Sequence, residues 1–414
     1  MKQHFLLILS FIFFWMPESR GQFSMEAFLS GSRDDQSLQQ VQDKLDFLKD
    51  NNFNSPWLRE TEVRIRSNDF NVSPEDFRLR FSPSNPWQIK ANKQYYKVQQ
   101  SQLDIEYLFT LNKTLRTRYD LLIEHFHTSE FEELNKLKFQ YYSDVLKIIG
   151  QYGSTMNLDV KDLVDADKSQ LEARLGWKEM AFQREEIESH IKEISAFTGD
   201  IDWKDLNIIL VEDIKPIIQS IQLELDVSNV YIAQIEQKNA LSAARMDVEK
   251  TEARQNIGYL QAEYDIDRGK SFERHFGYQI GLSIPLTNPD KPDINRRKIS
   301  LMDDETALNN RKIMVARRQK LLKLRLDHLI DQYDFVTEKL SILEENKILQ
   351  ISGLDKNPDP DKFLKMREYQ LELVDKKIEI SKDLYEAYIS YLDYAGKLVQ
   401  TPVKNYLSRF MKEF

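Results

Sequence analysis

Apolar and polar residues alternate in four short segments of this chain, and the segments form two pairs. The first pair lies at about 60–83 and the second at about 257–286, and the alternation predicts β-strands. Each pair precedes a far longer stretch in which apolar residues recur three and four positions apart, the spacing of one helix face. The pattern therefore predicts a strand pair and a very long helix, repeated with an offset of about 200 residues.

Each long helix has a clear predicted start. Asn85-Pro86 and Asn288-Pro289 combine a favourable N-cap residue with proline at the first helical position, where its missing N–H costs nothing. The apolar stripe is narrow and charged residues fill the remaining surface, which favours a coiled coil over a globular core. The predicted stripes comprise Leu103, Tyr107, Leu111, Leu115, Tyr119, Leu122 and Phe126 in the first helix, and Leu321, Leu324, His328, Tyr333, Val336 and Leu340 in the second.

Glycine-containing turns follow both long helices, and shorter helices return from them. We also expect a helix from about Asp213 to Arg254, preceded by a short strand or packing loop. The predicted organisation begins with a signal peptide at 1–21. The first repeat is 22–199, with a strand pair at 60–83, a long helix at 86–149 and a return helix at 160–197, and an equatorial segment at 200–212 separates it from the second repeat. The second repeat is 213–400, with a strand pair at 257–286, a long helix at 289–352 and a return helix at 361–395, and a C-terminal tail at 401–414 follows it.

The N-terminus has the features of a secretion signal. Lys2 precedes an apolar run, Phe5–Trp15, which is too short to span a bilayer, and Ser19 and Gly21 are small residues before a cleavage site at Gln22. No later segment has 18 consecutive apolar residues, so we expect no transmembrane helix in the mature chain. The sequence has no cysteine, which excludes disulfides and thiolate metal sites.

The composition points away from a compact enzyme and from nucleic-acid binding. Charged residues make up 30% of the 414 residues and the formal net charge is −9, whereas a generic nucleic-acid-binding surface is basic. The usual phosphate-binding, zinc-protease and nucleophile-elbow motifs are missing, so we predict no enzyme activity and no cofactor. His125 and His127 are two positions apart, which on a helix directs them to different sides and favours an ordinary helix surface over a zinc site.

One face of the predicted strands suits lipid. Segments of about ten residues with one apolar face have the length of a bilayer-spanning strand, although a soluble hairpin layer would alternate in the same way. Four strands cannot close a barrel around a channel, so the membrane interpretation requires several chains to share one barrel. The lipid-facing candidates are Val63, Ile65, Phe77, Leu79, Phe81, Tyr278, Ile280, Leu282 and Ile284.

The opposite strand face would then line the lumen. Its candidates are Arg64, Arg66, Arg78, Arg80, Gln261, Glu263 and Asp265. Four arginines on one face have two explanations, which are charge pairing with acids on neighbouring strands and a positively biased pore. The sequence leaves both explanations open.

The order of these elements and three local motifs resemble the TolC family of outer-membrane efflux proteins. The segment 276–286, FGYQIGLSIPL, is similar to the family's Gly-rich strand that ends at Ile-Pro-Leu before a long helix. The segment 157–173 is similar to the tip of the first helical hairpin, and 362–371 to the tip of the second. The resemblance extends from about Asp35 to Lys397, nearly the whole mature chain.

The resemblance implies an α+β membrane protein, a homotrimer in which each chain gives four strands to one outer-membrane β-barrel, continuous with a long periplasmic helical tunnel. It implies an export conduit of an efflux or type I secretion system, with a periplasmic adaptor and an inner-membrane transporter as partners. In the family, acids near the helix tips control the entrance. The entrance candidates here are Asp159, Asp162, Asp165, Asp355, Asp359, Asp361, Lys362 and Lys365, and the lysines depart from a simple acidic ring.

A second function remains open from the residues alone. The first strand pair is rich in arginine and only modestly apolar, which would also suit a secreted coiled-coil scaffold of the cell envelope that forms no channel.

Overall fold

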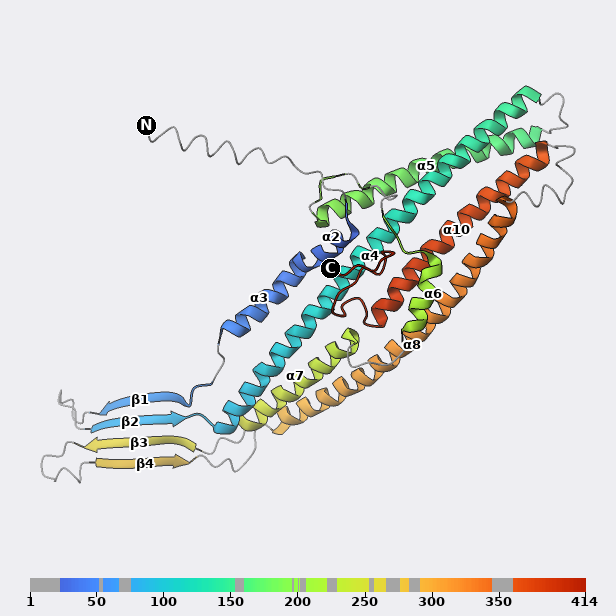
Figure 1. Cartoon of the computed structure of the whole chain (residues 1–414). Coiled ribbons are helices and arrows are strands. Elements are labelled where there is room, and N and C mark those ends of the chain that lie inside the picture. Colours follow the sequence, from blue (N-terminus) through green and yellow to red (C-terminus); the bar gives the residue numbers. More distant parts are fainter. Residues whose placement is uncertain are drawn as a thin grey trace, which may run out of the picture. The chain divides into compact units, whose positions relative to one another are not determined.

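The computed structural model describes residues 23–51, 55–66, 76–152, 160–195, 197–199, 201, 206–221, 229–252, 257–265, 276–282, 291–344 and 360–414. The predicted signal peptide and cleavage site therefore lie outside the described residues. The chain forms two compact units (Figure 1). The strand unit comprises Gln36–Asn112 and Glu224–Arg318, and the helical unit comprises Met1–Asp35, Lys113–Leu223 and Gln319–Phe414.

The strand unit contains one four-stranded antiparallel sheet with the order β1-β2-β3-β4. Its strands are β1 (Leu58–Arg66), β2 (Asp76–Pro83), β3 (Ile257–Asp265) and β4 (Phe276–Leu282). The β2–β3 pairing joins the two repeats, with Phe81 opposite Leu260 and Phe77 opposite Tyr264. Within the described part of the chain, β1 and β4 each pair on one side only, so the sheet is open at both edges.

Four helices of the strand unit continue from the sheet: α3 (Gln36–Asp50), the first part of α4 (Pro86–Tyr152), α7 (Val230–Glu252) and the first part of α8 (Lys291–Glu344). Asn85 caps α4, since its Oδ1 accepts a hydrogen bond from the backbone N–H of Trp87 at 3.0 Å. Its Nδ2 also donates to the carbonyl oxygen of Thr251 at 2.9 Å, which ties the start of α4 to the end of α7.

The helical unit contains α2 (Met25–Ser30), η1 (Gly31–Asp34), α5 (Val160–Ser195), α6 (Val211–Ser220), α10 (Pro360–Tyr394) and the remaining parts of α4 and α8. Its long helices lie in the order α5, α4, α10, α8 (Figure 1). Ion pairs join α5 to α4 (Arg184–Glu132), α4 to α10 (Lys138–Asp375) and α10 to α8 (Arg325–Asp383). Therefore α5 and α8 are the two outer helices of this row.

The apolar stripe of α4 agrees with the prediction in the helical unit, where Leu115, Tyr119 and Leu122 are buried. The stripe predicted for α8 is partly wrong, because the side chains of Leu321 and Leu324 are 54% and 57% exposed. The buried row of α8 instead contains Leu322, Leu326, Leu329, Ile330, Val336, Leu340 and Leu343. Periodicity shows that a helix has an apolar stripe, but neighbouring helices decide which of two adjacent stripes they cover.

The single helix expected from Asp213 to Arg254 is two helices. α6 ends at Ser220, because Ile221 has an extended backbone with φ −79° and ψ 105°. α7 begins at Val230, where Asn229 Oδ1 accepts a hydrogen bond from the N–H of Tyr231 at 3.1 Å. Asn229 is the local signal that could have indicated this second start.

The segment before α6 packs against the C-terminal tail. Ile208 forms an isolated antiparallel bridge with Ser408, and the N–H of Ile209 donates to the carbonyl oxygen of Leu407 at 2.8 Å. The hydroxyl of Tyr119 in α4 donates to the carbonyl oxygen of Lys404 at 2.9 Å. The tail is thus an integrated part of the helical unit. Among the described helices, none combines the length and the apolarity needed to cross a membrane.

Candidate functional site

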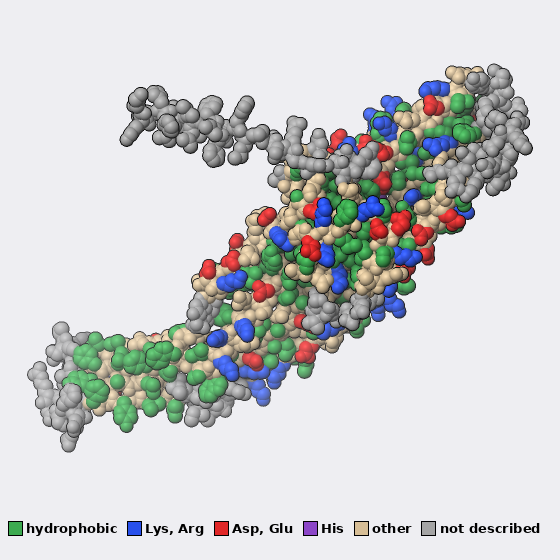
Figure 2. Space-filling model, in the orientation of Figure 1, with side chains coloured by type: hydrophobic (Ala, Val, Ile, Leu, Met, Phe, Trp, Pro, Cys, Tyr) green, Lys and Arg blue, Asp and Glu red, His purple; other side chains and the backbone are tan. Residues whose placement is uncertain are grey.

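One face of the sheet is apolar and exposed. The register places Val63, Leu79, Ala262 and Tyr278 side by side across the four strands. Tyr278 is 90% exposed, and Figure 2 shows a continuous hydrophobic surface over the strands. The described lipid-facing candidates all lie on this face, which comprises Val63, Ile65, Phe77, Leu79, Phe81, Leu260, Ala262, Tyr264, Phe276, Tyr278, Ile280 and Leu282. The candidate Ile284 lies outside the described residues.

The other face is polar, and three of its described arginines form ion pairs. Arg78 Nη2 lies 2.7 Å from Glu263 Oε1 on β3, and Arg80 Nη1 lies 3.5 Å from Glu62 Oε2 on β1. Arg64 Nε also lies 2.6 Å from an oxygen of Glu62. Of the two explanations that the sequence left open, charge pairing therefore accounts for these three arginines.

The remaining candidates of this face occupy consistent positions. Gln261 is opposite Arg80 and Gln279, and its Nε2 donates to Gln279 Oε1 at 3.5 Å. Arg66 and Asp265 align with Asp76 in the register, but their side chains lie outside the described set. Glu62 and Asp76 were not among the predicted lumen residues, although strand alternation places them on the same face as the arginines.

A stack of three residues crosses this polar face. The guanidinium carbon of Arg80 lies 3.8 Å from the ring centroid of Tyr259 on β3. The Tyr259 ring in turn covers Gly281 on β4, where a Cβ atom would lie only 2.3 Å from the ring. A side chain at position 281 would force the Tyr259 ring to move, and glycine leaves room for that ring.

The hairpin ends carry the predicted entrance residues. Asp162 and Asp165 are exposed in the first turns of α5, and Lys365 is exposed in α10. Asp159, Asp355 and Asp359 lie outside the described residues, and the side chains of Asp361 and Lys362 are not described. These predicted entrance roles therefore remain predictions.

Two tyrosines connect the hairpins of the two repeats. The hydroxyl of Tyr141 donates to the carbonyl oxygen of Leu364 at 2.7 Å, and that of Tyr142 donates to Glu368 Oε1 at 2.9 Å. Burial, together with the adjacent Glu368 carboxylate, raises the pKa of Tyr142. No local sequence pattern indicates these two hydrogen bonds, because their partners lie more than 200 positions away in the chain.

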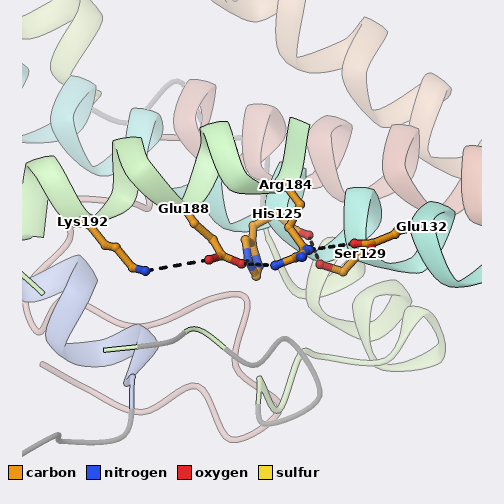
Figure 3. Close-up of polar contacts among 6 residues, drawn as sticks. All are labelled: His125, Ser129, Glu132, Arg184, Glu188 and Lys192. Atoms are coloured by element: carbon orange, nitrogen blue, oxygen red, sulfur yellow. Dashed lines mark hydrogen bonds and ion pairs between the residues drawn. The ribbon is translucent and has the colours of Figure 1, made fainter. Parts of the chain in front are cut away.

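A polar clamp joins α4 to α5 (Figure 3). Arg184 of α5 donates from Nε to Glu132 Oε2 at 2.7 Å and from Nη1 to Glu188 Oε1 at 2.6 Å. His125 Nε2 lies 3.3 Å from the same Glu188 oxygen, and Lys192 Nζ lies 3.9 Å from the other. Burial by itself raises the pKa of Glu188, but its hydrogen bonds with His125 and Arg184 outweigh burial and lower that pKa.

The two histidines that the sequence places on an ordinary helix surface are buried, so that expectation is wrong. His125 faces α5, whereas His127 Nε2 lies 3.3 Å from Ser381 Oγ on α10 and its Nδ1 lies 2.8 Å from the carbonyl oxygen of Ile123. Burial lowers the pKa of His127 to about 4. The imidazoles therefore serve two different helix contacts. Among the described residues, no group of three or more His, Asp or Glu is arranged to hold a metal ion.

Burial also perturbs a carboxyl group one turn after His127. The pKa of Glu130 is raised to about 7 by burial, which outweighs the attraction of Lys377 on α10. Glu130 also lies near the phenol groups of Tyr333 on α8 and Tyr385 on α10. It is thus an unusual acid within the packing of three long helices.

An open four-stranded antiparallel sheet with opposite polar and apolar faces, continued by two very long helices, defines the fold of the TolC-type outer-membrane channels. The solved structures with this fold include the outer membrane protein VceC of Vibrio cholerae, with a TM-score of 0.64 and 9% identity over 90% of this chain and 96% of that one. They also include the MtrE outer membrane channel of Neisseria gonorrhoeae, with a TM-score of 0.64 and 9% identity over 93% of this chain and 90% of that one.

A third similar structure is the CmeC outer membrane channel of Campylobacter jejuni, with a TM-score of 0.59 and 12% identity over 92% of this chain and 84% of that one. No protein-family model and no curated protein matches this sequence. The resemblance inferred from the sequence is confirmed for the fold. Two of these similar structures are described as outer membrane channels.

Proposed function

We propose that this chain is a subunit of an outer-membrane export channel and acts as a passive conduit. The observation that supports this proposal most strongly is the sheet, because it has an exposed apolar face, a charge-paired polar face and two open edges. An apolar band facing lipid and a polar interior are the two faces of a transmembrane barrel. Open strand edges in a bilayer must be paired, because hydrocarbon offers no hydrogen bonds.

Three copies would close such a barrel. All three neighbouring strand pairs are antiparallel, so β1 and β4 run in opposite directions and β4 of one copy can pair antiparallel with β1 of the next. Three copies would contribute about twelve strands, within the size range of small barrels. The 9 residues of β3 span about 30 Å at about 3.3 Å per residue, and a tilt of about 40° gives a height near the ~25 Å of an apolar band.

The helical unit provides a second argument for closure with copies of the chain. α5 and α8 are the outer helices of its row, and both expose apolar side chains at helical spacing. The exposed residues are Val164, Leu171, Leu175 and Phe182 on α5, and Leu321, Leu324 and Phe335 on α8. We propose that α5 of one copy packs against α8 of the next, which explains why Leu321 and Leu324 of α8 are exposed in a single chain.

The remaining parts of the proposal follow from the resemblance. The conduit would lie in the outer membrane with a periplasmic helical tunnel, and an inner-membrane transporter coupled through a periplasmic adaptor would drive export. Asp162 and Asp165 would act at the entrance of the first hairpin, whereas Lys365 would add positive charge at the second. Outward movement of the hairpin ends would open the channel, and the system would serve efflux or type I protein secretion.

A pair of matched substitutions tests the membrane span. Ile280→Arg places a charge on the apolar face, and Gln279→Arg places the same charge on the polar face of the same strand. We expect Ile280→Arg to lose about 2–4 kcal/mol of membrane stability and to prevent trimer assembly. Gln279→Arg should assemble and conduct in planar bilayers. Equal assembly of both variants in membranes, or a wild-type trimer that never conducts, would refute the proposal.

The alternative function is a secreted coiled-coil scaffold of the envelope that forms no channel. It is favoured by β1, where Arg64 and Glu62 alternate with only two aliphatic residues, Val63 and Ile65. A scaffold would remain soluble without detergent and would tolerate Ile280→Arg. The same experiment therefore separates the two functions.

A further inference from the structure

The charge of this acidic chain reverses where each long helix leaves the sheet. Between Pro86 and Leu103, α4 carries Lys90, Lys93 and Lys97 and no acidic residue. Residues 291–302 of α8 carry Lys291, Arg296, Arg297 and Lys298 and one acid, Asp293. The first segment has three positive charges and no negative charge, and the second has four positive charges and one negative charge. Each of these two basic segments therefore has a net charge of +3, whereas the whole chain has −9.

The helices that lead into the sheet do not share this charge. The last eight residues of α3, 43–50, hold two lysines and three aspartates, and the last eight of α7, 245–252, hold two basic residues and three acids. Each therefore has a net charge of −1. The reversal occurs in both repeats at the same place in the fold, so it belongs to the boundary between strand and helix.

The helices contain few acids that could balance the basic segments. The partial positive charge of a helix N-terminus acts within the first turn, where α4 has no acid and α8 has Lys291 as well as Asp293. Lys90, Lys93, Lys291, Arg296 and Lys298 are all exposed, and α4 has no acid in its first turn. Arg296 Nη2 lies 3.3 Å from Asp293 Oδ1 within α8, and Arg297 Nε lies 3.1 Å from Glu249 of α7. Surplus positive charge at two helix starts indicates an external anion.

The position of the segments identifies the anion, on the basis of the proposed membrane span. Trp57 and Trp87, at the helix end of the first strand pair, are 75% and 65% exposed, as expected for tryptophans at a membrane–water interface. Figure 2 shows Lys and Arg side chains next to the apolar surface of the strands on the same visible face. With a rise of about 1.5 Å per residue, Lys90 lies about 6 Å and Lys93 about 10 Å beyond Pro86 along α4. The headgroup layer is about 7 Å deep, so the side chains of both lysines can reach it.

We propose that the two basic segments bind the phosphate groups of anionic phospholipids in the leaflet that faces the helices. Lys90 and Lys93 of one repeat and Lys291, Arg296 and Lys298 of the other hold these headgroups, and Trp57 and Trp87 lie at the same boundary. Lys97 is about 16 Å from Pro86 along α4 and contributes less, because the attraction falls off within a Debye length.

The test uses the full-length assembled protein in vesicles that contain either brominated phosphatidylglycerol or brominated phosphatidylcholine. Quenching of tryptophan fluorescence by each brominated lipid measures its relative binding constant at the protein surface. We expect the relative binding constant of phosphatidylglycerol to be at least about fivefold that of phosphatidylcholine. A ratio of this size is the contribution of about one lysine or arginine near an anionic lipid surface. The quadruple variant Lys90→Gln, Lys93→Gln, Lys291→Gln, Lys298→Gln should reduce the preference to about onefold, and Lys97→Gln alone should change it little.

The matched control removes four exposed lysines from the helical unit, as Lys161→Gln, Lys178→Gln, Lys320→Gln and Lys339→Gln. This control has the same net charge as the quadruple variant and should keep the wild-type preference. A wild-type protein without preference, or an equal loss in both variants, overturns the proposal. Loss of the preference with millimolar inorganic phosphate alone would assign the segments to a free anion and overturn the assignment to lipid. Conductance of the same samples reports separately on the channel function.

Discussion

The clamp between α4 and α5 allows the sharpest stability prediction for the helical unit. Replacing Arg184 with Met keeps the aliphatic stem and removes two charge-assisted hydrogen bonds, of 2.7 Å to Glu132 and 2.6 Å to Glu188. A hydrogen bond to a charged group contributes about 1.5–3 kcal/mol when it is buried. The side chains of Arg184 and Glu188 are 29% and 13% exposed, so solvent reduces the effect. We expect Arg184→Met to cost about 2–3 kcal/mol.

A double-mutant cycle isolates the clamp from general loss of packing. Arg184→Met, Glu188→Gln and the double variant are compared by denaturant unfolding of the assembled protein in detergent. Residues in direct contact should show a coupling energy of about 1 kcal/mol or more. Lys147→Met is the control, because its ion pair with Asp144 is exposed on both sides and should contribute less than about 0.5 kcal/mol.

The pH dependence provides an independent measurement of the same clamp. The pKa of Glu188 is lowered in the folded protein, so its stabilisation is present above the unfolded pKa and is lost as the pH falls through the folded value. The destabilisation by Arg184→Met should therefore be largest near neutral pH and should shrink in acid. Additive single effects, or a cost that does not depend on pH, would refute the interpretation of Figure 3 as a coupled network.

Three further changes test other parts of the structure. Glu263→Gln removes the carboxylate that lies 2.7 Å from Arg78. The reversal potential of the channel in planar bilayers should therefore shift toward anion selectivity, and an unchanged potential would show that this face does not line the pore. Gly281→Ala should lower the yield of assembled protein because the new Cβ atom would meet the Tyr259 ring. Adding Tyr259→Ala to the same chain should restore the yield, and failure to restore it would contradict the stacking of Tyr259 on Gly281. Glu130 has a pKa of about 7, above its unfolded value, so its contribution to stability should be lost as the pH rises from about 4.5 to 7, and the stability difference between wild type and Glu130→Gln should change over this range in pH-dependent unfolding. Equal pH profiles of the two proteins would contradict the burial of Glu130.

Several features depend on local chemistry and could be predicted directly. The period of two in the strand segments determined which residues share a face, because successive side chains of any strand point to opposite sides. The Asn85-Pro86 dipeptide indicated the start of α4, since capping depends on residues adjacent in the chain. The apolar and polar sets could therefore be assigned to opposite faces before any strand pairing was known.

Other features depend on which distant segments meet. The sequence left open whether the arginines pair with acids, and the register across β1, β2 and β3 decided it by placing Glu62 beside Arg80 and Glu263 beside Arg78. The burial of His125 and His127 follows from α5 and α10 packing on opposite sides of α4, and the histidine spacing alone did not show this. The bridge between Ile208 and Ser408 joins residues 200 positions apart and has no local signal.

The sequence by itself thus determined the type and the two-faced character of most elements, because periodicity and capping act over a few neighbouring residues. The tertiary structure decided the strand register, the stripe of α8 that is covered, the partners of the buried polar groups and the docking of the tail. Each of these depends on packing and pairing between residues far apart in the chain, which no local pattern specifies.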